Sequence, residues 1–426
     1  MTWLTPFRAC FGHQAQHIAL GQYVNGLLND SPRKSMQAML ARVTDPVRYQ
    51  SFQHFITDAP WEAEDVWRVL RAELPERDGM VVLDDTGFPK KGDVSVGVKR
   101  QYTGTLGKVA NCQVAVTATF WTTARSWLIG AALYLPKEWL AVRRDRQLAR
   151  IPTGVRFQEK WQLALTLLRD AIASGLQVSD VLADAGYGDA TAFRAALHAL
   201  GLSYAVGISS NTAVFPGTPT ILPPTREPKA GAQRQPRPRL APGVRAIKIS
   251  ALVADVPRDA WRRITWRNGD QTPRVARFAA LRVTPSKDWY RDLAPEVWLL
   301  CEQSLDGTYD DKFFLIHRPV TTSRQDLVWL AHQRWAIEQQ YQHLKTELGL
   351  DHFEGRTYPG WNHHVALSAV TYAFLQRERL TREPTKISFE TIRAIVQEVF
   401  TGLIFASHPR YMQWLADARK LLPLRL

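Results

Sequence analysis

Three acidic residues stand where a carboxylate could do chemistry. Asp84 follows the apolar run MVVL, Asp184 follows the run VLA, and Glu338 lies in the stretch RWAIEQQYQHLKTELGL. Three clustered carboxylates repel one another and persist only if cations bridge them, and Mg²⁺ or Mn²⁺ suits such oxygen ligands. A pair of these ions could activate water or a 3′-hydroxyl group and stabilise the entering and leaving oxygens at phosphorus. The pattern therefore favours phosphodiester chemistry.

The first acidic run leaves one choice open. Asp84 and Asp85 are adjacent, and adjacent residues of a strand point to opposite faces, so both can be ligands only if the strand bulges. Carboxylates at the ends of two strands and one on a helix can converge at one edge of a sheet. We therefore expect Asp184, Glu338 and one of the two adjacent acids to meet there.

The stretch around Glu338 predicts one amphipathic helix with an ordered polar face. At about 100° per residue, one narrow face carries Arg334, Glu338, Tyr341 and Lys345. An apolar stripe about a quarter-turn away consists of Leu330, Ile337, Leu344 and Leu348. The same spacing is typical of a solvated helix surface with salt bridges. Whether other segments of the chain supply partners for Glu338 distinguishes a functional face from a solvated helix surface.

The composition favours a polyanionic partner. The formal net charge is +14 and the isoelectric point is near 9.8, which points first to nucleic acid. We find neither an apolar run of about 18 residues nor a basic amphipathic anchor, so no membrane association is expected. The three cysteines specify neither a disulfide framework nor a zinc site, and no secretory signal is evident. These features indicate a cytoplasmic protein whose metal ligands are oxygens.

The elements that would position the acids follow from the spacing of apolar residues. Three short helices, each opened by a proline, are predicted between Pro32 and Leu74 and carry several basic residues. Residues 1–78 are therefore expected to form a helical domain, either a DNA reader or an ordinary bundle. Residues 79–210 begin with β-rich runs and continue with alternating helices and strands, which predicts a mixed sheet flanked by helices.

A basic, proline-rich segment interrupts this pattern. We expect a flexible loop at residues 211–244, either a plain insertion or a contact to the phosphate backbone through Arg226, Lys229, Arg234, Arg237 and Arg239. Further strands follow, so residues 211–320 are interpreted as this loop and a β-rich insertion. Residues 321–426 would contain the helix of Glu338 and a C-terminal helical region.

Three blocks of the chain resemble the catalytic blocks of a known family. VVLDDTGFPKKG, VLADAGYG and RWAIEQQYQHLKTELGLDHFEGR are similar to those of bacterial insertion-sequence transposases with a DDE, RNase H-like core, most closely the IS701 group within the IS4-like set. SVGVKRQYTGTLGKVANCQV and GWNHHVAL match as well, and the resemblance spans nearly the whole chain. It implies an α/β RNase H-like core with a β-rich insertion and an N-terminal helical domain.

The resemblance assigns roles to individual residues. The pattern Asp-x-Thr selects Asp84 rather than Asp85, and Asp-x-Gly-Tyr selects Asp184. The pattern Tyr-x2-Arg-x3-Glu-x6-Lys places Glu338 as the last metal ligand. By the same pattern, Arg334 and Lys345 would bind DNA phosphates beside the cut. Ala331 stands where the pattern has Tyr, so the contact of that Tyr must be lost or supplied elsewhere, for example by Tyr341.

Other residues carry weaker signals for DNA contact. Lys90 and Lys91 follow the first acidic run and could touch DNA or lie in a solvated turn. Trp335 could stack on an unpaired base near the cut or belong to the core.

The resemblance also implies an activity. The protein would bind terminal inverted repeats of double-stranded DNA, cleave their ends with two Mg²⁺ or Mn²⁺ ions and join the 3′ ends to target DNA. Paired ends require at least two copies, so a homodimer is expected in the synaptic complex, associated with the nucleoid when DNA is bound. The alternatives are a domesticated, non-catalytic DNA-binding regulator and a metal-dependent nuclease without strand transfer.

Overall fold

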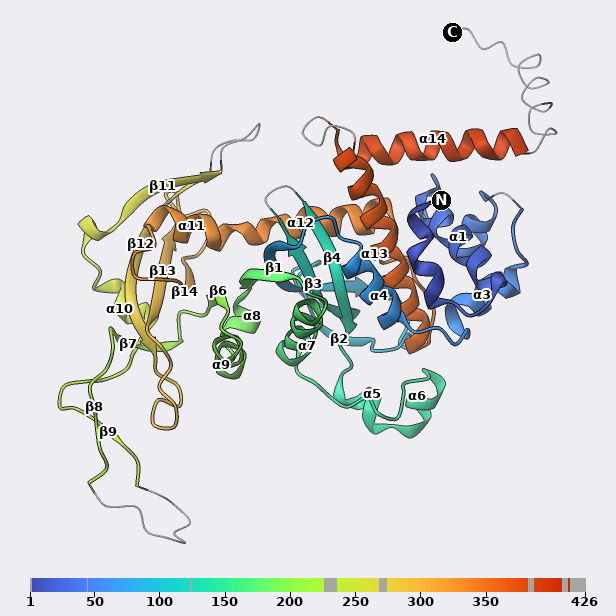
Figure 1. Ribbon diagram of the computed structural model, residues 1–426. Coiled ribbons are helices and arrows are strands. Elements are labelled where there is room, and N and C mark those ends of the chain that lie inside the picture. Colours follow the sequence, from blue (N-terminus) through green and yellow to red (C-terminus); the bar gives the residue numbers. More distant parts are fainter. Residues whose placement is uncertain are drawn as a thin grey trace.

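A computed structural model gives the arrangement of the chain (Figure 1). It describes residues 2–43, 45–122, 125–225, 236–267, 274–381, 387–407 and 413. Arg226, Lys229 and Arg234 of the predicted basic loop lie outside these residues. Within the described residues, no helix is both long enough and apolar enough to cross a bilayer.

One mixed sheet organises the molecule. Its order is β10-β7-β12-β13-β14-β6-β5-β1-β3-β2, with β11 paired to β12 and β4 paired to β3. Strands β5 and β6 run parallel to β1, whereas β3, β4 and β14 pair in antiparallel fashion. The strands are β1 (Asp78–Pro89), β2 (Lys99–Thr103), β3 (Lys108–Trp121), β4 (Ser126–Leu133), β5 (Gln177–Ala183), β6 (Ser203–Ile208), β7 (Ala213–Pro216), β10 (Ile247–Lys248), β11 (Arg262–Arg267), β12 (Arg274–Pro285), β13 (Val297–Gln303) and β14 (Lys312–His317). A mixed sheet was expected, and the structure contains one.

The central strands are buried on both faces, and their residues alternate between two apolar clusters. Val81 of β1 and Val181 of β5 belong to the larger cluster. Val82 and Leu182 belong to a smaller cluster under the helix that precedes Glu338. Because side chains alternate along a strand, Asp84 and Asp184 fall on the same face as Val82 and Leu182. The strand pattern therefore directs both acids toward that helix.

The long helix α13 (Tyr358–Thr381) joins the N-terminal helices to the sheet (Figure 1). Trp3 donates its indole N–H to the carbonyl of Val370 at 3.1 Å, and His363 lies 2.7 Å from the carbonyl oxygens of both Ile56 and Trp61. The N-terminal helices are α1 (Gln14–Leu28), α2 (Met36–Leu40), α3 (Tyr49–Thr57) and α4 (Ala63–Ala72). They share one apolar cluster with α13 and part of the sheet.

Smaller helices cover the remaining faces and edges. The α-helices are α5 (Lys137–Ala141), α6 (Arg143–Leu148), α7 (Lys160–Ala173), α8 (Ala185–Gly188), α9 (Thr191–Ala199), α10 (Ile249–Ala254), α11 (Arg324–His332), α12 (Ala336–Gln342) and α14 (Phe389–Ser407). The 3-10 helices are η1 (Thr2–Leu4), η2 (Pro6–Cys10), η3 (Arg258–Ala260) and η4 (Gln333–Trp335). A π-helical turn, η5 (His343–Glu347), follows α12.

The structure corrects the expected loop at residues 211–244. Val214 and Phe215 are buried in β7, which joins the edge of the main sheet, and Ile221–Leu222 (β8) pairs with Arg239–Leu240 (β9). Because prolines and glycines interrupt this segment, the spacing of its apolar residues did not indicate these short strands. The later strands extend the main sheet rather than standing apart from it, because β14 pairs directly with β6.

Candidate active site

Strand pairing brings Asp84 and Asp184 together. The parallel pairing of β1 with β5 ends at Leu83 opposite Ala183. Asp184 follows the last residue of β5, whereas Asp84 was expected at a strand end but lies within β1, which continues to Pro89. Asp184 caps α8, and its Oδ1 accepts a hydrogen bond from the backbone N–H of Gly186 at 2.9 Å. A Cβ at Gly188 would lie 1.9 Å from the carbonyl oxygen of Gly207. The glycine therefore lets α8 pack closely on β6 and fixes the turn that carries Asp184.

The two adjacent acids of β1 face different elements. Asp84 Oδ2 accepts a hydrogen bond from Arg334 Nη1 at 2.5 Å, from the helix side of the sheet. Asp85 Oδ2 instead pairs with Lys160 of α7 at 2.7 Å. The structure thus brings Asp84 to the segment of Glu338, and it gives Asp85 a basic partner that no nearby sequence signal indicated.

The predicted helix is present, but it is not one regular α-helix. A 3-10 turn at Gln333–Trp335 precedes α12, and a π-helical turn at His343–Glu347 follows it. The uniform rotation of 100° per residue therefore does not hold along the whole segment. The apolar stripe is nevertheless buried throughout: Leu330, Ile337, Leu344 and Leu348. Its first two members contact the smaller apolar cluster and its last two the larger one.

Arg334 lies among the three predicted ligands. Burial lowers the pKa of Arg334, but the charges of Asp84, Asp184 and Glu338 outweigh burial and raise it. Glu338 is exposed on α12. Arg334 therefore forms an ion pair with Asp84, and the charges of Asp184 and Glu338 further stabilise its charged form.

The pKa of Asp84 is raised to about 7. Burial is the main cause, Arg334 acts against it, and the nearby charge of Asp184 adds to it. The pKa of Asp184 is also raised, mainly by burial, although Arg334 and backbone N–H groups oppose the rise. At Asp84 burial outweighs the single arginine, whereas at Arg334 three carboxylates outweigh burial. A second positive charge near Asp84 and Asp184 would stabilise their charged forms and lower both pKa values.

The arrangement was tested as a metal site. Within the described residues, no three His, Cys, Asp or Glu side chains are positioned to hold one ion. Arg334 pairs with Asp84, and the charges of Asp184 and Glu338 also raise its pKa, so the set has the charge and the oxygen donors that Mg²⁺ or Mn²⁺ requires. Asp84, Asp184 and Glu338 fit such ions as a donor set if Arg334 gives up its place beside Asp84.

A cleft of about 370 Å³ adjoins Glu338. Basic and aromatic side chains from the β11–β12 strands face α12 across it: the cleft is lined by Trp266, Arg274, Lys312, Ala331, His332, Gln333, Arg334, Trp335, Glu338, Gln339 and Gln342. Trp335 is 37% exposed, and its ring centroid lies 6.3 Å from that of Trp121. The sequence did not indicate Trp266, Arg274 or Lys312, because they approach Glu338 only once β11, β12 and β14 have joined the sheet.

Two other predicted residues of the helix face the sheet. Tyr341 has its hydroxyl 2.6 Å from Thr117 Oγ1. Lys345 donates to the carbonyl of Gly87 at 3.0 Å and to Thr105 Oγ1 at 3.1 Å. Their predicted roles in DNA binding stay predictions. In the structure both side chains tie the helix to β1 and its neighbours.

The remaining predicted contacts are dispersed. Lys90 donates to the carbonyl of Phe353 at 2.6 Å, and Lys91 is exposed. Arg237 lies over the ring of Tyr290 at 4.2 Å, and Arg239 belongs to β9. None of these four contacts the acids in the described structure.

Tyr187 is a feature that spacing alone did not single out. It is 1% exposed, and within the described chain its hydroxyl has no hydrogen-bond partner. Burial and the charges of Asp85, Asp84 and Asp184 raise its pKa well above the usual value. A neutral phenol therefore lies beside the acids with its hydroxyl available as a donor.

Comparisons with known proteins show the family of the chain. Residues 6–273, more than half of the chain, match the family described as DDE superfamily endonuclease. The chain is also similar to a probable transposase for insertion sequence element IS701 from Microchaete diplosiphon, with 32% identity over 192 residues. That alignment covers 44% of this chain and 47% of the relative, so it spans about half of the relative's length. The family match includes Asp84 and Asp184 and ends before Glu338.

Proposed function

Because the chain belongs to the DDE superfamily endonucleases, we propose that it is a DNA transposase. It binds the terminal inverted repeats of its element, cleaves phosphodiester bonds at their ends and transfers the 3′-hydroxyl ends into target DNA. The single observation that carries this proposal is the β1–β5 register, which sets Asp84 beside Asp184, with Arg334 of the Glu338 segment paired to Asp84. The similarity to a probable insertion-sequence transposase supports it.

The core is proposed to be RNase H-like. The strand order β4-β3-β1-β5-β6, with β5 and β6 parallel to β1, supports this assignment, and Asp84 and Asp184 follow directly where the pairing of β1 with β5 ends. Residues 1–78 would serve as the DNA-binding helical part and residues 211–320 as the loop and β-rich insertion. Residues 79–210 and 321–426 would supply the catalytic core.

Asp84, Asp184 and Glu338 would hold two Mg²⁺ or Mn²⁺ ions. When bound, these ions would supply an activated oxygen nucleophile and stabilise the charge on the leaving oxygen. Because the pKa values of Asp84 and Asp184 are raised, a bound cation would stabilise the charged forms of these carboxylates. Once Arg334 no longer pairs with Asp84, its guanidinium is free to bind a DNA phosphate.

The cleft beside Glu338 supports a site for the DNA end. Arg274 and Lys312 bring positive charge from the opposite side, and Trp266 and Trp335 provide flat apolar surfaces. The partner would be double-stranded DNA, and a homodimer would pair two ends in the synaptic complex. The net charge of +14 supports binding to this polyanion, in the cytoplasm and at the nucleoid.

The test is incubation of the protein with a labelled transposon end and a target plasmid, in Mg²⁺ or in EDTA. Cleavage with joining in Mg²⁺ alone supports the transposase. Cleavage without joining would identify a nuclease, and binding without cleavage would identify a regulator. The exposed Asp93 provides a matched control, since Asp93→Asn should cleave and join like the wild type while Glu338→Gln should not.

A further inference from the structure

The β2–β3 hairpin presents an exposed face that the active-site chemistry does not explain. Tyr102 stands opposite Val109 in the register, and Arg100 stands opposite Asn111, so these four side chains share one face of the ribbon. Tyr102 is 62% exposed, Val109 is 51% exposed, and Leu106 in the connecting turn is 43% exposed. Exposed apolar side chains gathered on a sheet edge mark an interaction surface.

The tip of this ribbon is fastened to the active-site strand. A Cβ at Gly87 would lie 1.8 Å from Thr103 Oγ1, so the glycine lets the buried Thr103 pack directly against β1. Thr105 accepts a hydrogen bond from Gly87 N–H at 3.3 Å and another from Lys345 at 3.1 Å. Gly87 is three residues beyond Asp84, and Lys345 follows α12. The ribbon therefore holds a fixed position relative to the candidate catalytic acids.

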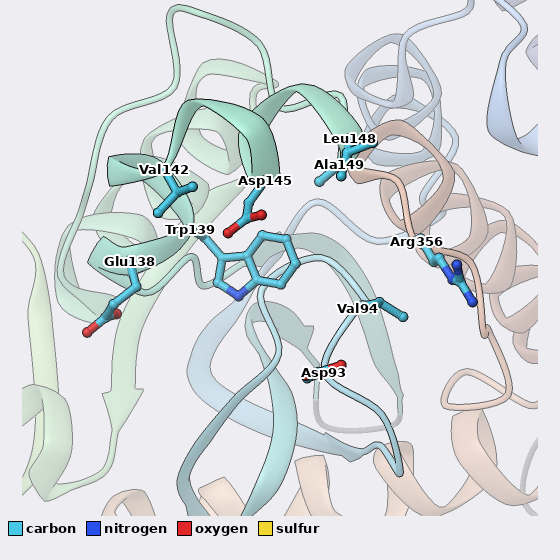
Figure 2. A pocket seen from close by; sticks show the side chains of 9 residues that line it. All are labelled: Asp93, Val94, Glu138, Trp139, Val142, Asp145, Leu148, Ala149 and Arg356. Atoms are coloured by element: carbon cyan, nitrogen blue, oxygen red, sulfur yellow. The ribbon is translucent and has the colours of Figure 1, made fainter.

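The base of the ribbon is braced by α5. Trp139 donates its indole N–H to the carbonyl of Val98 at 2.8 Å, and Lys99 pairs with Glu138 at 2.6 Å. Figure 2 shows these two α5 residues at a cleft of about 500 Å³, which Asp93 and Asp145 also line. Three carboxylates and one arginine, Arg356, line this cleft, so its charge does not favour a polyanion.

The β2–β3 ribbon, in contrast to this cleft, carries positive charge. Lys99, Arg100 and Lys108 lie within it, and the sequence from 99 to 111 contains no acidic residue. Asn111 donates to the carbonyl oxygens of Lys90 and Gly92, which sets the exposed Lys91 beside the ribbon. Positive charge flanking an apolar ridge suits duplex DNA, whose major groove admits a two-stranded ribbon between two rows of phosphates.

We propose that the β2–β3 ribbon enters the major groove of the DNA next to the candidate active site. Arg100 and Lys108 contact phosphates on its two sides, and Tyr102, Leu106 and Val109 lie against the base edges. Thr105 and Lys345 link the ribbon to the catalytic segment, so DNA held in this way is placed relative to Asp84. This inference rests on the proposed transposase function and adds the surface that orients its DNA.

Salt dependence of DNA binding tests the phosphate contacts. Gel shifts with a transposon-end duplex, without divalent metal, should show that Arg100→Ala/Lys108→Ala lowers the log–log salt slope by about 1.8, at about 0.9 per phosphate. The matched control is Arg143→Ala/Arg144→Ala on α6, two exposed arginines that should leave the slope unchanged. An unchanged slope in the ribbon variant would overturn the proposal.

Cross-linking tests the position of the tip. Leu106→Cys, labelled with a photoreactive group, should cross-link to bases near the cleavage position, whereas Leu148→Cys on α6, which replaces an exposed leucine of 66% exposure, should not. Tyr102→Ala should reduce single-turnover cleavage about tenfold without changing the melting temperature. Wild-type cleavage without a cross-link at position 106 would overturn the ribbon proposal alone. Absence of any metal-dependent cleavage by the wild type would overturn the transposase function instead.

Discussion

Two carboxylates with little solvent exposure, Glu302 and Asp84, flank the segment α11–η4, and their pKa values shift in opposite directions. Glu302 of β13 is fully buried; it accepts a hydrogen bond from Tyr309 OH at 2.7 Å, lies 3.1 Å from His332 Nε2 and forms an ion pair with Lys312 Nζ at 3.8 Å. Burial alone would raise the pKa of Glu302, but these three partners lower it. Asp84 has Arg334 and its neighbour's backbone N–H as partners, and its pKa is raised to about 7.

The difference separates an acid that supports the fold from an acid suited to bind a ligand. Glu302 has enough donors for both oxygens, so removing it would harm packing. Asp84 is repelled by Asp184 and by Asp85, and the fold provides one arginine to offset both. The charged form of Asp84 is therefore only partly stabilised, and a bound cation would stabilise it further.

Asp84→Asn should reduce single-turnover cleavage of a transposon end by about 10³-fold or more, because the amide keeps the shape but loses the charge that holds metal. Gel shifts should show that DNA binding persists. Asp93→Asn is the control on an exposed acid. Cleavage by Asp84→Asn within tenfold of the wild-type rate would remove Asp84 from the proposed ligand set.

Glu302→Ala should lower the free energy of unfolding by about 3 kcal/mol, since it leaves the half-buried His332 and Tyr309 groups without their acceptor and Lys312 without its partner. Glu302→Gln should recover part of this loss. Urea denaturation measures both. If Glu302→Ala unfolds like the wild type, the two buried acids do not differ in the way proposed here.

The same replacement of Asp84 should stabilise the metal-free protein at high pH. The pKa of Asp84 is about 7 in the folded state and 3.8 as an ordinary carboxyl, so the folded state binds more protons between these values. The contribution of Asp84 to stability therefore falls as pH rises from about 4 to about 7. Asp84→Asn should gain about 2 kcal/mol at pH 8 and almost nothing at pH 4.

Thermal unfolding in EDTA at both pH values measures this gain. Equal destabilisation of Asp84→Asn at pH 4 and pH 8 would mean that the ion pair with Arg334 outweighs the cost of burial.

Tyr341→Phe should have the smallest effect, about 1 kcal/mol of stability from the lost hydrogen bond to Thr117 and a few-fold slower cleavage. Thr117→Val removes the same bond from the other side. The two variants and their combination form a cycle in which the double variant should lose little beyond either single one. A fully additive loss would show that the hydroxyl of Tyr341 acts elsewhere.

The sequence predicted the parts of the site that depend on local pattern. Asp184 follows the end of β5 as expected, and Asp84 lies beside it although β1 continues to Pro89; the apolar stripe from Leu330 to Leu348 is buried as expected. Such features follow from the period of a strand or helix, which is visible in the sequence itself.

Other features required the tertiary arrangement. Lys160 reaches Asp85 across 75 positions of sequence, and Arg334 turns to Asp84 rather than outward. The π-helical turn after α12 lets Lys345 meet Gly87 and Thr105, although the spacing of apolar residues predicted an unbroken helix. The strands around the predicted loop were missed because they are short and derive their stability from pairing with distant strands.

Metal-directed cleavage of the protein backbone would test the shared metal site most directly. Fe²⁺ bound in place of Mg²⁺, with ascorbate and peroxide, generates radicals that cut the chain next to the ion. The account predicts cuts near residues 84, 184 and 338 together, suppressed by excess Mg²⁺ and weakened at all three positions by Glu338→Gln. Cuts near one acid alone, or an unchanged pattern in Glu338→Gln, would contradict the claim that these three carboxylates hold metal jointly.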